Sequence, residues 1–96
     1  MSKVFIKFYS DIRGIVGRDS ITMNIEEDEI IDSLIGRLCK KFPDSFSKII
    51  YEPKTKQLNS SLIILKNHIP ITLLEGVNTK ILDGDEITFF AAVSGG

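Results

Sequence analysis

The chain has 96 residues, of which 43% are hydrophobic and 26% are charged, and its formal net charge is -1. A chain of this length forms one domain with a modest core, which excludes an enzyme that encloses a large active-site cleft. The nearly balanced charge gives no nucleic-acid footprint, and the single cysteine, Cys39, excludes an internal disulfide and a multi-cysteine zinc site. No apolar run approaches the roughly 18 residues that span a bilayer, and no signal peptide is evident, so we expect a cytoplasmic protein that binds no membrane.

The N-terminal part of the chain contains two segments with the alternation of a β-strand. In residues 3–9, three apolar side chains share one face, whereas Phe5 and Tyr9 lie on the other. Residues 11–20 contain two glycines and are expected to form a loop. The alternation returns in residues 21–26, which are expected to pair with the first segment as an antiparallel hairpin.

A helical pattern of apolar residues follows the two strands. Asp28 is a candidate N-cap, apolar side chains recur at every fourth position up to Phe42, and Pro43 ends the pattern. Glu29 and its acidic neighbours are interpreted as a solvated helix start. Cys39 lies on the apolar stripe, which favours a buried structural thiol over a cysteine that transfers sulfur.

Shorter elements make up the second half of the chain. Residues 44–50 are expected to form a short helical turn and residues 51–59 an exposed loop. An intensely apolar segment, residues 61–66, predicts a strand, and a turn after it leads to a short edge strand that ends by Leu73. The last predicted strand covers residues 87–90.

The order of these elements is strand, strand, helix, strand, short strand, strand. One main helix with a wide apolar face, packed on a mixed sheet of four or five strands, is an α+β fold of two layers, and this order is that of the ubiquitin-like β-grasp. We expect residues 1–92 to form this domain and residues 93–96 to form a flexible C-terminal tail.

The expected strand order also brings three aromatic side chains to one face of the sheet. The last strand of this fold lies beside the first, so Phe90 is expected next to Phe5 and Tyr9 on the face away from the helix. An exposed apolar patch on a small monomer usually marks a partner surface. We interpret the three residues as partner-binding; packing of Phe90 under a loop is the alternative.

The chain ends with Gly95 and Gly96, and its terminal carboxylate is the most evident reactive group. Two glycines make a thin tail that can enter a narrow active site, although chain ends without any function are also common. Asp83, Asp85 and Glu86 surround an Asp-Gly turn signal, which favours a tight turn entering a strand over a metal or acid–base site. We therefore expect no bound metal. The sequence also contains no phosphate-binding loop and no nucleophile with an evident histidine base.

A recognisable pattern runs through the C-terminal part of the chain. It consists of Leu74, Glu75, Gly76, Thr79, Leu82, Asp83, Gly84, Asp85, Glu86, Ile87, Phe90, Val93, Ser94, Gly95 and Gly96. With this pattern the whole chain resembles the small sulfur-carrier subunit of molybdopterin synthase and its relatives, the archaeal ubiquitin-like small modifiers and the thiamine-type sulfur carriers. That family often carries two prolines where this chain has Ala91 and Ala92, and their absence predicts a looser exit of the tail.

The resemblance implies a cycle in which the chain carries sulfur and other proteins perform the chemistry. An E1-like activating enzyme would use ATP to adenylate the Gly96 carboxylate, and a persulfide sulfur donor would convert the adenylate to a thiocarboxylate. The tail residues Val93, Ser94 and Gly95 would then insert into the large subunit of molybdopterin synthase, within a heterotetramer, for sulfur donation in molybdenum or tungsten cofactor synthesis. On this interpretation the chain is not itself an enzyme and binds no cofactor.

The sequence leaves two other functions open. A ubiquitin-like protein modifier would use the same activation but would form an isopeptide bond from Gly96 to lysines of target proteins. A β-grasp interaction module with an inert tail would not use Gly96, and it predicts that deletion of Gly95 and Gly96 changes nothing.

Overall fold

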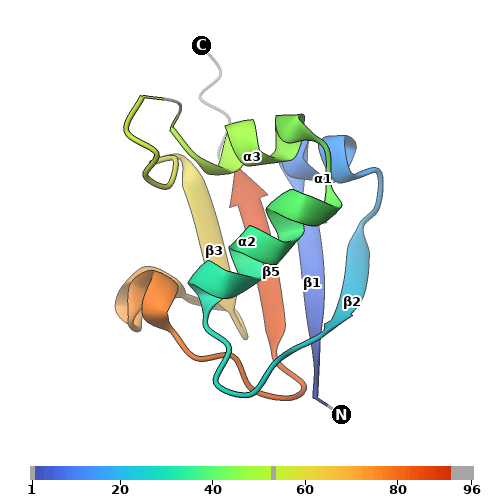
Figure 1. Cartoon of the computed structure of the whole chain (residues 1–96), viewed down its shortest axis with the longest axis vertical. Helices are drawn as coiled ribbons and strands as arrows, with labels where there is room; N and C mark the ends of the chain where they lie inside the picture. The colour runs from blue at the N-terminus through green and yellow to red at the C-terminus, as the bar shows by residue number, and fades with distance from the viewer. Residues whose placement is uncertain (1, 53, 92–96) are drawn as a thin grey trace.

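A computed structural model describes residues 2–52 and 54–91, so the expected tail of residues 93–96 lies outside the described part of the chain. The strands are β1 (Lys3–Tyr9), β2 (Ser20–Asn24), β3 (Leu62–Lys66), β4 (Ile69–Pro70) and β5 (Glu86–Ala91). The α-helices are α1 (Ser10–Val16), α2 (Ile31–Lys41) and α3 (Asp44–Ile50), and two short 3-10 helices are η1 (Ile71–Leu73) and η2 (Gly76–Asn78). Within the described residues, the strands form one sheet in the order β2-β1-β5-β3-β4, and α2 crosses one of its faces (Figure 1).

The first and last strands lie side by side at the centre of the sheet. β1 and β5 pair in parallel, with Phe8 opposite Phe89 and Tyr9 opposite Phe90. β2 pairs antiparallel with β1, which confirms the expected hairpin, and β3 pairs antiparallel with β5. A parallel pair requires a crossover connection, and the helix layer on one face of the sheet lies within that crossover. The predicted α+β architecture with a mixed sheet is therefore confirmed.

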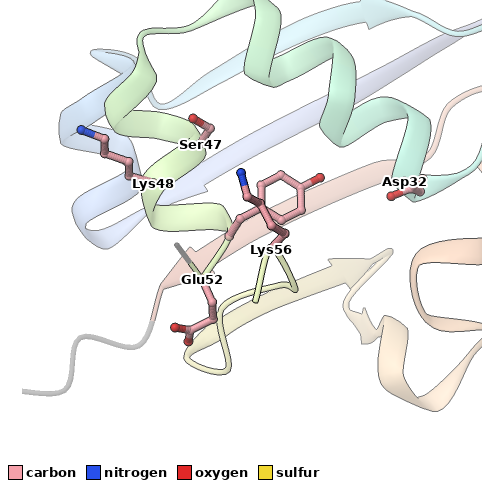
Figure 2. A pocket seen from close by; sticks show the side chains of 6 residues that line it. Asp32, Ser47, Lys48, Glu52 and Lys56 are labelled. Carbon is pink, nitrogen blue, oxygen red and sulfur yellow. The ribbon is translucent and has the colours of Figure 1, made fainter. Parts of the chain in front are cut away.

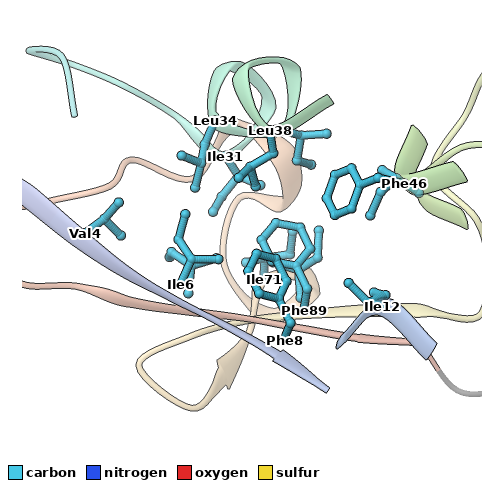
Figure 3. Close-up of a cluster of buried hydrophobic side chains, with 14 of the residues drawn as sticks. Val4, Ile6, Phe8, Ile12, Ile31, Leu34, Leu38, Phe46, Ile71 and Phe89 are labelled. Atoms are coloured by element: carbon cyan, nitrogen blue, oxygen red, sulfur yellow. The ribbon is translucent and has the colours of Figure 1, made fainter. Parts of the chain in front are cut away.

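The hydrophobic core fills the space between the sheet and its helices (Figure 3). Phe8 of β1 and Phe89 of β5 stack with their ring centroids 6.1 Å apart, and Phe46 of α3 lies 6.4 Å from each of them. The other large, fully buried side chains are Val4, Ile6, Ile12, Ile31, Leu34, Ile35, Leu38, Ile50 and Ile87. The side chains of β1 that point into the core are the ones predicted from its alternation. The side chains on its outward face are therefore also the predicted ones.

Helix α1 occupies most of the segment for which a loop was expected, so that expectation is wrong. Its side chain Ile12 is fully buried and anchors the helix to the core. The helix ends at Gly17, which adopts a left-handed conformation (φ 79°) and donates its N–H to the Arg13 carbonyl at 2.8 Å. A helix of seven residues, which is about two turns, with one fully buried side chain is too short to display a clear helical period in the sequence.

The predicted N-cap at Asp28 is also wrong. Asp28 has a positive φ of 61°, and α2 begins only at Ile31. The N-cap is Ile30, whose N–H donates to the Ser33 hydroxyl at 3.2 Å while that hydroxyl donates to the Ile30 carbonyl at 2.9 Å. The N–H of Ile31 donates to the carbonyl of Thr79 at 3.0 Å. This long-range contact, which local sequence does not reveal, therefore helps to position the start of the helix.

Glu29 lies in the protein interior, so its assignment to a solvated helix start is wrong. Its side chain is 2% exposed, and its Oε1 accepts the Glu26 backbone N–H at 2.9 Å and Arg37 Nη1 at 2.7 Å. Its backbone carbonyl accepts the Ile81 N–H at 2.9 Å. The residue therefore joins the loop before α2 to the second turn of that helix and to the chain that leads into β5.

Replacement of Arg37 by alanine would leave the buried Glu29 carboxylate without its charged partner. We expect the free energy of unfolding to fall by about 2–3 kcal/mol, because an uncompensated buried charge is costly. Urea denaturation measures this loss. The double variant Arg37→Ala/Glu29→Gln is expected to regain part of it, since a neutral amide is easier to bury than a carboxylate; a double variant less stable than Arg37→Ala would contradict this account.

Candidate functional site: the open sheet face beside the chain end

The described chain ends on the central strand β5. Its last described residue, Ala91, lies opposite Leu62 of β3, and the preceding residue Phe90 lies opposite Tyr9 of β1. Because β1 and β5 are parallel, β5 ends on the same side of the sheet as the C-terminal end of β1 (Figure 1). The predicted reactive residue, Gly96, follows β5 in the sequence but lies outside the described residues, together with Val93, Ser94 and Gly95.

The three aromatic residues predicted to bind a partner are exposed on the sheet face opposite the helices. Phe5 is 48%, Tyr9 42% and Phe90 38% exposed. Tyr9 and Phe90 are direct cross-strand neighbours, whereas Phe5 lies opposite Glu86, further from the chain end. The predicted exposure and the predicted neighbourhood of the last and first strands are thus confirmed, and no loop of the described residues buries Phe90. Their binding role stays a prediction.

Sequence reasoning missed one member of this surface. Ile63 of β3 is 40% exposed and lies opposite Phe90, so that Tyr9, Phe90 and Ile63 form one row across three strands. β3 is apolar on both faces, and an unbroken apolar run does not show which side chains point to the core. We name Phe5, Tyr9, Ile63 and Phe90 the sheet-face patch.

A hollow of about 400 Å³ lies on this face, between β1, β5 and β3. Its floor is Thr88, which is only 6% exposed although it points away from the helices, because Lys7 and Leu65 flank it on the neighbouring strands. The residues that line the hollow are Tyr9, Ile63, Leu65, His68, Glu86, Thr88 and Phe90. The patch is therefore not flat, and its concave part begins at the row of residues next to the chain end.

The turn that leads into β5 is held by a network centred on Asp85. Asp85 is buried; its carboxylate accepts the Leu82 N–H at 2.7 Å and Asn67 Nδ2 at 2.9 Å, and Lys66 Nζ lies 3.4 Å away. Gly84 has a φ of 86°, as the predicted Asp-Gly turn requires. The predicted turn is confirmed. The burial of Asp85 was not predicted, because two of its partners, Lys66 and Asn67, come from the end of β3 and the turn after it. This network fixes where β5 and its outward side chains begin.

A second, larger hollow of about 640 Å³ lies between α3 and the start of α2 (Figure 2). Two lysines, two carboxylates, a tyrosine and a serine line it: Asp32, Ser47, Lys48, Tyr51, Glu52 and Lys56. Figure 2 shows Asp32 and Lys48 at opposite ends, so their charges do not converge on one point. In the part of the chain that the structure describes, no group of three or more His, Cys, Asp or Glu side chains could hold a metal ion. The residues of this hollow therefore indicate a binding site less clearly than those of the sheet face.

Cys39 lies on the half-buried edge of the α2 stripe, and burial raises the pKa of its thiol. The thiolate is the reactive form of cysteine, so a raised pKa makes the thiol less reactive at neutral pH. We expect iodoacetamide to alkylate Cys39 in the folded protein about tenfold more slowly than in the urea-unfolded chain. A time course of intact mass measures both rates. Equal rates would contradict the structural interpretation of this thiol.

Among the described residues, none of the helices has the length and apolar character needed to cross a membrane.

His68, in the turn between β3 and β4, has a side chain that is 81% exposed.

The fold and the patch beside the chain end define a ubiquitin-like β-grasp protein. The chain belongs to the ThiS family, whose model matches residues 6–96. It is 25% identical over 91 residues to small archaeal modifier protein 3 of Haloferax volcanii, a match that covers 95% of this chain and 96% of that protein. Small archaeal modifier protein 1 of Methanosarcina acetivorans, whose solution structure is known, is 28% identical and superimposes with a TM-score of 0.84 over 100% of this chain and 98% of that one.

A putative molybdopterin converting factor subunit 1 from Pyrococcus furiosus is similar in fold. Its structure gives a TM-score of 0.76 over 97% of this chain and 100% of that one, at 19% sequence identity. At this identity the likeness concerns the fold alone. The expected ubiquitin-like β-grasp and the resemblance to the sulfur-carrier and small-modifier family are thus confirmed.

Proposed function

We propose that this chain is a sulfur carrier whose Gly96 carboxylate is adenylated by an E1-like enzyme and then converted to a thiocarboxylate. The observation that carries the proposal is the position of the sheet-face patch. Tyr9, Phe90 and Ile63 form an exposed row across the inner strands β1, β5 and β3, close to the C-terminal end of β5. A partner that docks on this row holds the C-terminal carboxylate within a short chain length of its own active site.

The two chemical steps follow from the reactivity of the groups involved. A carboxylate is a poor electrophile, so its oxygen must first become part of a good leaving group, and adenylation by ATP supplies AMP for that role. A persulfide then attacks the acyl carbon, AMP leaves, and reduction of the remaining sulfur–sulfur bond by a thiol releases the thiocarboxylate. The activating enzyme and the sulfur donor supply these reactants, and the chain supplies the carbonyl carbon of Gly96.

The acceptor of the sulfur is proposed to be the pterin precursor of the molybdenum or tungsten cofactor, bound in the large subunit of molybdopterin synthase. The resemblance of the C-terminal pattern and the fold shared with a putative molybdopterin converting factor subunit support this assignment. Reconstitution tests it: thiocarboxylated chain mixed with the large subunit of the same organism is expected to convert the precursor to molybdopterin, and the chain with an unmodified carboxylate is not. Equal conversion by both forms would contradict it.

A second function, conjugation of Gly96 to lysines of other proteins, is favoured by the relationship to small archaeal modifier protein 3. No Lys or Arg follows Lys80 in the sequence, so trypsin would leave the long remnant 81–96 on a target lysine. The variant Ser94→Arg leaves only Gly95 and Gly96, which is readily identified by mass spectrometry. Remnants on cellular lysines that require ATP and the activating enzyme would establish conjugation. Their absence, with thiocarboxylate present, would leave the carrier function alone.

A further inference from the structure

One oxygen atom in the hollow of the sheet face lacks a hydrogen-bond donor in the described part of the chain. Glu86 Oε1 is buried and has no donor among the described residues. The other oxygen, Oε2, lies 3.2 Å from Lys7 Nζ, so only one side of the carboxylate is paired. His68 Nε2 lies 3.6 Å from Oε1, which is too long for a hydrogen bond. The Glu86 side chain as a whole is 24% exposed. Carboxylate oxygens in folded proteins nearly always accept hydrogen bonds from protein groups or water, so Oε1 is available to accept one from an incoming side chain.

The backbone of Glu86 is fixed by Asn67. The Glu86 N–H donates to Asn67 Oδ1 at 2.9 Å, and its carbonyl accepts the Asn67 N–H at 2.8 Å. Asn67 Nδ2 in turn donates to the buried Asp85. The fixed backbone and the contact of Oε2 with Lys7 limit the positions that the carboxylate can take, which favours a binding role.

The surroundings of this oxygen match one kind of side chain. Beyond Glu86 the hollow continues over Thr88 and Leu65 to the aromatic neighbours Tyr9 and Phe90. An arginine has an apolar stem that packs on such a floor, a planar guanidinium that stacks on aromatic rings, and N–H groups that pair with a carboxylate. A lysine ammonium offers no comparable planar stacking.

We propose that the hollow binds an arginine side chain of the activating enzyme, with its guanidinium donating to Glu86 Oε1. The inference rests on the proposed function, because it assumes that the activating enzyme docks on this face. The His68 ring lies near Oε1, but its side chain is 81% exposed, so the ring can be displaced by the incoming side chain. Glu86 is then the carboxylate of a largely apolar hollow that also contains Thr88 and His68, and it selects enzymes that present an arginine at this point.

Binding of the full chain to the E1-like activating enzyme of the same organism, measured by isothermal titration calorimetry, tests the proposal. Glu86→Gln keeps the size of the side chain but removes its charge, and we expect it to weaken binding about tenfold or more. The matched control is Glu27→Gln, which removes one exposed carboxylate from the loop before α2. Equal affinities of Glu86→Gln and wild type would overturn the inference, and thermal unfolding verifies that both variants fold.

Two further measurements identify the donor. Alanine substitutions of the surface arginines of the enzyme are expected to reveal one that weakens binding of the wild type but not of Glu86→Gln; the absence of any such arginine would overturn the inference. His68→Ala is expected to bind at least as tightly as wild type. If it loses as much affinity as Glu86→Gln, His68 is the donor for Oε1 and the inference is wrong. Failure of the wild type to bind or to be adenylated would instead overturn the proposed function.

Discussion

Deletion of Gly95 and Gly96 is expected to abolish thiocarboxylate formation while the protein stays folded. The shortened chain would end at Ser94, and its carboxylate would fall short of the activating site by about 7 Å. A misplacement of about 1 Å can already cost about 100-fold in rate, so we expect a loss of at least that size. The residues of the hydrophobic core lie within residues 4–91, so thermal unfolding of the deletion variant should match that of the wild type.

The control for this deletion is Ser94→Ala, which keeps the length of the tail and both glycines and is expected to retain activity. Pyrophosphate exchange by the activating enzyme reports the adenylation of each variant directly. If the deletion variant supports exchange as well as the wild type, the tail is inert and the chain is an interaction module, as the third sequence-based hypothesis holds.

Phe89 and Phe90 are expected to give opposite phenotypes although they are neighbours in the sequence. Phe89 is fully buried between Phe8 and Phe46, so Phe89→Ala should lower the free energy of unfolding by about 3–5 kcal/mol. A domain of this size is stable by about 5–15 kcal/mol in total, so the variant should be partly unfolded at moderate temperature. Phe90 is 38% exposed, and its truncation should cost no more than about 1 kcal/mol of stability.

The binding measurements are expected to reverse this order. Phe90→Ala removes an aromatic side chain from the middle of the exposed row, where truncation of a central anchor typically costs about 2 kcal/mol or more of binding free energy. The affinity for the activating enzyme should therefore fall by about 30-fold. Unfolding in urea and calorimetric titration, applied to both variants at a temperature where Phe89→Ala is folded, measure the two effects. A Phe90→Ala variant with unchanged affinity would contradict the role of the sheet-face patch.

Residues whose environment is set by a local pattern were predicted correctly. The alternation in β1 assigns Phe5 and Tyr9 to the outer face, and the Asp-Gly signal places the turn before β5. Both predictions depend only on residues that are neighbours in the sequence. The first uses the two-residue period of a strand, and the second uses the left-handed conformation that glycine adopts at Gly84. The exposure of Phe90 could be predicted as well, once the last strand was placed beside the first.

Residues whose environment is set by distant segments were not predicted. Glu29 was assigned to a solvated helix start and Asp85 to a tight turn, but Arg37 and Asn67, respectively, are among the donors to their buried carboxylates. Ile63 could not be assigned to the open face because its strand is apolar on both sides. The donor-free oxygen of Glu86 depends on the placement of side chains from three strands and a turn, so no sequence pattern indicates it.

The measurement that tests the central claim most directly is the intact mass of the chain after incubation with ATP, the activating enzyme and a persulfide sulfur donor. Replacement of one terminal oxygen by sulfur is expected to raise the mass by about 16 Da, and only when all three components are present. The variant that lacks Gly95 and Gly96 should keep its original mass. An unchanged mass of the wild type, in a mixture where the same enzyme and donor convert a known carrier, would contradict the claim that Gly96 carries sulfur.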